Sequence, residues 1–141
     1  MLLFKKKFLP AIRSGEKTQT IRLWSVCRMK AGQRSYIPGA GYIRVVSVDA
    51  VDLPSLSDDD ARPDGFSTAD ALRRELTALY AGQLAAGHRA YRIRFELLSS
   101  EEQAAAVAAR KAAKAAAESA GPATEMNETH VGRLSGRDLE N

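Results

Sequence analysis

The segment from Gly15 to Arg22 places a glycine, a lysine, two threonines and an arginine within eight positions. A lysine in a partly dry site loses proton affinity, so Lys17 could act as a base or a polarising group. Thr20 offers a hydroxyl that becomes a nucleophile if a neighbour takes its proton, and Arg22 offers a fork for phosphate or carboxylate. These residue types could form a reactive pocket. A plain helix-to-strand turn with polar residues on an edge strand would give the same sequence pattern.

The spacing within this segment sets a condition for such a pocket. Residues three apart on a straight strand point to opposite faces, so Lys17 and Thr20 can share a pocket only if the chain bends between them. Thr20 and Arg22 share a face without any bend.

Positive charge is concentrated in the same part of the chain. Residues 1–50 contain ten Lys and Arg against two acidic residues, whereas residues 51–100 contain six against eight and residues 101–141 five against seven. Concentrated positive charge favours an anionic partner, most often phosphate. A solvated basic face without a ligand remains an equal alternative on charge alone.

Further side chains are candidates for binding a nucleic acid or a nucleoside. The lysine run could contact phosphates, although such runs are more often solvated edges. The two aromatic residues could stack on a base, although packing in the core or rim is the commoner role. The two arginines lie on the expected wet face of an alternating strand. In chain order these candidates are Lys5, Lys6, Lys7, Trp24, Tyr36, Arg92 and Arg94.

The chain is poor in ligands for a metal. Two histidines and the single cysteine, Cys27, are a small inventory for zinc or iron, and consecutive acids such as Asp58–Asp60 do not converge on one ion without a dedicated loop. We therefore expect no metal and no cofactor. A single cysteine forms no internal disulfide and suggests a reducing cytoplasm, and no apolar run reaches the roughly 18 residues of a membrane span.

The elements that must position these residues are short. We expect one strand to start at residues 2–4 and four further strands to cover residues 17–24, 35–37, 42–51 and 91–97. A helix over residues 8–14 is ended by Gly15. One or two acidic helical turns cover 55–61 and are ended by Pro63-Asp64-Gly65. Ser67 is expected to cap a helix with an apolar stripe, followed by a loop over 81–87.

This order predicts the α+β class. Because regular strand–helix alternation is absent, we expect a mixed or antiparallel sheet curled into a small β-barrel with flanking helices, not a doubly wound fold. The barrel domain is assigned to residues 1–100, an alanine-rich helix to 101–120 and a disordered tail to 121–141.

The pattern Gly15-x-Lys17-x-x-Thr20-x-Arg22 resembles the signature of the ASCH family, Gly-x-Lys-x-x-Glu-x-Arg. Asp64-Gly65-Phe66 and the closing Tyr-x-Ile-x-Phe strand resemble further landmarks, so that the resemblance covers roughly residues 2–98. It implies a PUA-like barrel related to RNA-binding modules.

Thr20 stands where the family signature has glutamate. A threonine at this position is similar to the bacterial ASCH acetylcytidine amidohydrolases. That branch implies Lys17 as base or activator, Thr20 as nucleophile, and Asp64 in place of a longer glutamate as proton relay to the leaving amine. The implied substrate is a modified nucleoside. A second branch implies RNA cleavage with the same lysine, and a non-catalytic RNA-binding module would need only the basic surface. All three remain open here.

Overall fold

The computed structural model describes residues 1–119. In chain order its elements are η1 (Lys6–Phe8), α1 (Leu9–Ser14), β1 (Gln19–Trp24), β2 (Arg34–Ile37), β3 (Gly41–Val51), η2 (Leu53–Ser55), α2 (Asp58–Ala61), η3 (Arg62–Asp64), α3 (Ala69–Leu79), α4 (Ala81–Ala85), β4 (Arg89–Leu97) and α5 (Ser100–Ser119), where η denotes a 3-10 helix. Among these described residues, no helix has both the length and the apolar character needed to cross a membrane.

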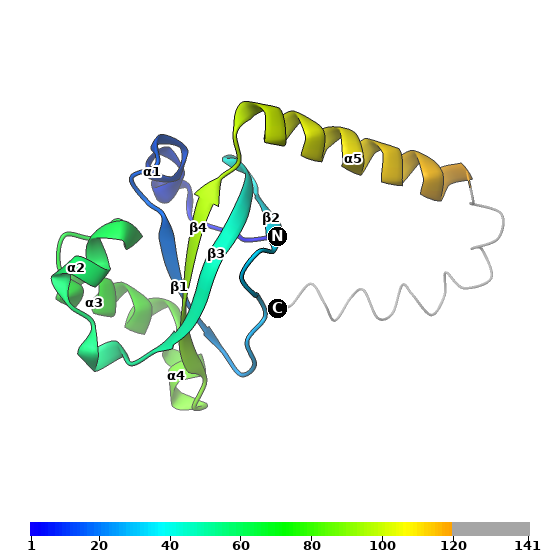
Figure 1. The fold of residues 1–141 in the computed structure, drawn as a ribbon. Helices are drawn as coiled ribbons and strands as arrows, with labels where there is room; N and C mark the ends of the chain where they lie inside the picture. Colours follow the sequence, from blue (N-terminus) through cyan, green and yellow to red (C-terminus); the bar gives the residue numbers. More distant parts are fainter. Residues whose placement is uncertain (120–141) are drawn as a thin grey trace. The chain divides into compact units, whose positions relative to one another are not determined.

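The four strands form one sheet in the order β1-β4-β3-β2, and every pairing in it is antiparallel (Figure 1). The register between β3 and β4 shifts between Val45 and Ser47, where one residue is left out of the ladder. Such a bulge bends the strand and increases its twist. The predicted α+β class and curled sheet are confirmed, with β1 and β2 as the two edge strands.

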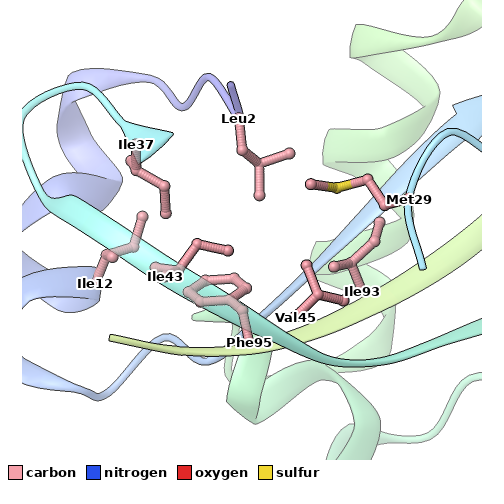
Figure 2. Packing of buried hydrophobic residues seen from close by; sticks show 8 residues of the cluster. All are labelled: Leu2, Ile12, Met29, Ile37, Ile43, Val45, Ile93 and Phe95. Atoms are coloured by element: carbon pink, nitrogen blue, oxygen red, sulfur yellow. The ribbon is translucent and has the colours of Figure 1, made fainter. Parts of the chain in front are cut away.

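Two apolar clusters hold the strands and helices together. Figure 2 shows the first, in which side chains from β2, β3 and β4 pack with Leu2, Ile12 and Met29. The second joins Ile21 and Leu23 of β1 to Leu72 and Leu76 of α3. In Figure 1, α2 and α3 lie beside β1, on the side of the sheet away from β2. Strand β1 therefore has α3 as a neighbour, and its residue Arg22 donates a hydrogen bond to the carbonyl of Leu3 in the N-terminal segment.

Three predicted elements differ from the structure. The residues around Leu2 form no strand, although the Leu2 N–H donates to the Tyr36 carbonyl at 2.9 Å. Residues 81–87 contain the helix α4, because alanine favours helix and the Leu84 N–H can donate to the carbonyl of Tyr80. The cap of α3 is Thr68, not Ser67, because Thr68 has the extended backbone and accepts from the backbone N–H of the third residue on.

The C-terminal predictions fall partly inside the described residues. The expected alanine-rich helix is present as α5, which starts within the compact unit of residues 1–103 and continues into a second unit that begins at residue 104. The predicted tail over residues 121–141 lies outside the described residues.

Candidate functional site

A cavity of about 320 Å³ is lined by the N-terminal segment, the start of β1, η3 and α3. Its wall is mainly leucine, isoleucine and aromatic carbon, with aromatic rings from Phe4, Phe8, Phe66 and Tyr80. Six polar side chains also reach it, namely Lys5, Lys17, Thr20, Arg22, Asp64 and Glu75. An apolar cavity with a few converging polar groups is the usual form of a small-molecule site.

The chain bends at the entry to β1, as Lys17 and Thr20 require in order to share a pocket. Lys17 and Thr18 precede β1, which begins only at Gln19. The Lys17 N–H donates to the Ala11 carbonyl at 3.0 Å, and the Thr18 N–H donates to the Pro63 carbonyl at 2.8 Å. The backbone is therefore held by α1 and η3 before it enters the sheet. As a result, Lys17 and Thr20 line the same cavity.

Lys17 and Asp64 form a buried ion pair. Their residues are 2% and 3% exposed, and Lys17 Nζ lies 2.6 Å from Asp64 Oδ1. The same ammonium also donates to the Asp64 backbone carbonyl, and it lies 4.9 Å from the centre of the Phe8 ring. Both charges thus sit in an aromatic, poorly hydrated environment.

Burial shifts both groups of this pair toward their neutral forms. Desolvation lowers the pKa of Lys17, and the charge of Asp64 only partly opposes it. Desolvation likewise raises the pKa of Asp64 against the opposing effect of Lys17. The two shifts bring the pKa values of Lys17 and Asp64 closer together, which suits the pair to acid–base chemistry.

The turn at Gly65 delivers Asp64 to the cavity. Gly65 has φ +96°, a left-handed conformation, and its N–H closes the 3-10 turn on the Arg62 carbonyl at 2.9 Å. A side chain at this φ is strained, whereas an added Cβ would lie an ordinary 3.8 Å from Cδ of Lys17. The cost of a substitution here therefore comes from the backbone.

We predict that Gly65→Ala destabilises the protein by about 1–2 kcal/mol, the usual cost of a left-handed non-glycine residue. Gly82→Ala is the matched control, because Gly82 lies in α4 without a positive φ and has open space around it. That change is expected to be neutral or slightly stabilising. Urea unfolding measures both variants, and equal effects would contradict the role assigned to the turn.

Arg22 orients Thr20 within the cavity. Thr20 is 5% exposed, and its Oγ1 accepts a hydrogen bond from Arg22 Nε at 3.1 Å. Arg22 Nη2 donates to the Leu3 carbonyl at 2.7 Å, and the guanidinium lies over the Phe4 ring at 4.7 Å. Burial lowers the pKa of Arg22, yet a guanidinium remains protonated in proteins. The Thr20 hydroxyl thus lies beside a fixed positive charge.

No family model matches the chain, and no curated protein matches it significantly. Solved structures do match. The chain is similar to the ASCH domain from Lactobacillus crispatus JV V101, with a TM-score of 0.54 and 15% identity over 62% of this chain and 68% of that one. The chain has the fold of an ASCH domain.

Two further structures share this fold. The hypothetical protein PH0355 matches with a TM-score of 0.59 and 14% identity, over 68% of this chain and 95% of that one. A protein from Enterococcus faecalis V583, described by the DUF984 family model, matches with a TM-score of 0.54 and 20% identity, over 65% and 70% of the two chains. These likenesses confirm the expected ASCH-type fold.

Within this ASCH fold, the three lysines of the run differ in whether they line the cavity. Lys5 lines the cavity, and its Nζ lies 3.2 Å from Oε2 of Glu75. Lys7 pairs with the same carboxylate at 3.5 Å but is not part of the lining, and neither is the exposed Lys6. The run therefore meets the cavity only at its first residue.

The remaining candidates lie away from the cavity of the ASCH fold. Trp24 packs against Tyr91 with ring centres 5.9 Å apart, and Tyr36 packs against Tyr42 at 5.0 Å. Arg92 pairs with Asp60 at 3.1 Å, and Arg94 is exposed on β4. The structure thus gathers Lys5, Lys17, Thr20, Arg22 and Asp64 around one cavity but not these four.

Sequence reasoning missed several lining residues. Glu75 lies among the apolar residues of α3, three positions after Leu72, a spacing that places both on one helix face. Phe4 and Phe8 flank the lysine run, and this aromatic spacing was an available signal for the cavity wall. Among residues 1–119, no group of three or more His, Cys, Asp or Glu side chains could hold a metal ion.

Proposed function

We propose that the cavity binds a nucleoside with an acylated exocyclic amine and hydrolyses its amide bond. The observation that carries this proposal is the buried Lys17–Asp64 pair, placed with Thr20 in one aromatic-walled cavity. Flat aromatic faces suit a planar base, and stacking of a base on an aromatic side chain contributes about 1–3 kcal/mol. Apolar walls exclude competing water from the reacting amide.

The first half of the proposed reaction forms an acyl-enzyme. In the reactive form of the pair, one proton has passed from Lys17 to Asp64. The Thr20 oxygen attacks the acyl carbonyl carbon while its proton passes to the neutral amine of Lys17. The carbonyl oxygen becomes an oxyanion, which the remaining N–H groups of Arg22 stabilise. Collapse of the tetrahedral intermediate breaks the C–N bond, and protonated Asp64 supplies the proton that the leaving amine needs.

The second half returns the enzyme to its starting state. Water attacks the acyl carbon of the Thr20 ester and passes one proton to the Asp64 carboxylate. The Thr20 oxygen then leaves and recovers its proton from the Lys17 ammonium. The products are the free nucleoside and a carboxylic acid, so atoms and protons balance over the cycle.

Mass spectrometry of two incubations tests this function. The first contains acetylcytidine and the second a short RNA, and the proposal expects cytidine and acetate from the first and intact RNA from the second. Cleaved RNA would favour the ribonuclease alternative. If neither substrate changes at high protein concentration, the hydrolase proposal fails for these substrates, and a salt-dependent affinity for RNA would then favour a binding module.

Arg22→Gln is predicted to lower kcat on acetylcytidine about 100-fold, the usual effect of losing one oxyanion-stabilising donor. The glutamine is uncharged and cannot stabilise the developing oxygen charge as a guanidinium does. Arg94→Gln is the matched control, because Arg94 is exposed on β4 and does not line the cavity. Steady-state kinetics compare the two, and similar losses in both would contradict a local role for Arg22.

A further inference from the structure

Gln19 is a buried polar residue that the proposed reaction does not use. It is the first residue of β1, its exposure is 0%, and it does not line the cavity. Its Nε2 donates to the Asp60 carbonyl at 2.9 Å and to Asp64 Oδ2 at 3.3 Å. Both hydrogens of one amide are thus directed at the segment that carries Asp64.

The Asp64 carboxylate is consequently held at both oxygens. Lys17 donates to Oδ1 at 2.6 Å, and Gln19 donates to Oδ2. Rotation of the carboxylate about its Cβ–Cγ bond would break both contacts. The Gln19 contact to the Asp60 carbonyl also joins the backbone of α2 to β1. The orientation of Asp64 toward Lys17 is therefore fixed from the side opposite the lysine.

The oxygen of the Gln19 amide indicates that this arrangement lowers the stability of the folded protein. Among residues 1–119, the buried Oε1 of Gln19 has no hydrogen-bond partner. A buried polar atom without a partner destabilises a protein, whereas an apolar side chain of the same shape avoids that loss. An apolar residue at position 19 would avoid this loss, but the Asp60 carbonyl and Asp64 Oδ2 would lose the hydrogen bonds that they accept from Gln19. These two donated hydrogen bonds account for the amide.

We propose that Gln19 is a positioning residue that acts through Asp64, holding its carboxylate in line for proton exchange with Lys17. The catalytic part of this inference rests on the proposed function, whereas the coupling between Gln19 and Asp64 does not. Burial raises the pKa of Asp64, and the hydrogen bond from Gln19 opposes that rise by stabilising the charged form. Loss of the amide should therefore move the Asp64 titration upward.

The coupling is tested without any substrate. Carbon-13 NMR follows the Asp64 carboxyl during a pH titration, and nitrogen-15 NMR follows the Gln19 side-chain amide in the same wild-type protein. We expect both signals to share one midpoint, and we expect Gln19→Met to move the carboxyl midpoint to higher pH by about one pH unit. A Gln19 amide that does not respond to Asp64 overturns the inference even if the variant fails to fold.

Kinetics on acetylcytidine test the catalytic part. Gln19→Met should lower kcat about tenfold with KM changed less than about twofold, because Asp64 keeps its contact with Lys17 but loses one of the two side-chain hydrogen bonds that orient it. In an Asp64→Asn background the same change should have no further effect. The control is Gln83→Met, on α4 and away from the cavity. Additive losses in the double variant would assign Gln19 a role independent of Asp64.

The two proposals fail in different ways. If wild-type protein hydrolyses no acylated nucleoside while Gln19 and Asp64 titrate together, the proposed function is rejected and the coupling stands. If hydrolysis occurs and the pH profile of kcat is the same in wild type and Gln19→Met, the positioning role is rejected and the proposed function stands.

Discussion

Lys17→Met is expected to lower kcat on acetylcytidine by about 10⁴-fold, the upper range for a general acid–base group. Methionine keeps the length and apolar contacts of the lysine stem but has no group that can take the Thr20 proton. Nucleoside binding should fall far less, because the aromatic rings of the cavity remain in place. Single-turnover kinetics and equilibrium binding of cytidine measure the two effects separately.

The control for this variant is Lys6→Met, which removes an exposed lysine that does not line the cavity. Its kinetics should match wild type. Thr20→Val should be as damaging as Lys17→Met, and the double variant should be no worse than either, because residues acting in one step are not additive. If Lys6→Met and Lys17→Met reduce turnover equally, the effect reflects general charge and the assigned base is wrong.

Asp64→Leu is expected to destabilise the protein by about 3–5 kcal/mol, because it leaves the Lys17 ammonium buried without its partner. The double variant Lys17→Met/Asp64→Leu should recover most of that loss, since two apolar side chains carry no charge to desolvate. Urea unfolding of the wild type, both single variants and the double variant gives the coupling free energy directly.

The Lys5–Glu75 pair provides the comparison for this cycle. The Lys5 side chain is half exposed, so solvent screens the pair, and its coupling should stay below about 1 kcal/mol. Equal coupling in the two pairs would contradict the account of a desolvated Lys17–Asp64 pair. A double variant as unstable as Asp64→Leu would contradict it as well.

Local patterns predicted the fold well where each residue type has one strong preference. Gly15 ends α1 with φ 85°, as a glycine after a short amphipathic helix should. The alternation in the last strand places Ile93 and Phe95 in the core, and five of the eleven residues of β3 are β-branched. These elements depend on neighbours in sequence, so their signals were visible without the tertiary structure.

Local patterns do not decide between neighbouring residues that compete for one role, and they do not show tertiary contacts. Ser67 and Thr68 can both cap a helix, and only the backbone conformation at Thr68 decides between them. Arg92 fits a wet strand face by alternation, yet its partner Asp60 comes from the distant α2 segment. Leu2 makes one backbone contact with β2 without joining the sheet. None of these outcomes follows from local pattern.

Predicting the candidate site required information that the spacing of residues alone does not contain. Lys17 and Asp64 lie 47 positions apart, and no periodic pattern links them. Resemblance to the ASCH signature grouped them, whereas the contacts of the Lys17 and Thr18 backbone to α1 and η3 explain how the bend is made. Glu75 joins the site through the packing of α3 against the N-terminal segment, whereas the spacing of Phe4 and Phe8 around the lysine run was a sequence signal for the aromatic wall.

An NMR titration with cytidine, the product of the proposed reaction, tests the central claim most directly. We expect amide shifts at cavity residues such as Thr20, Phe66 and Leu76, with an affinity that changes little with salt because no phosphate is bound. No response in the cavity at saturating cytidine, or shifts centred instead on Trp24, Tyr36 and Arg94, would contradict it.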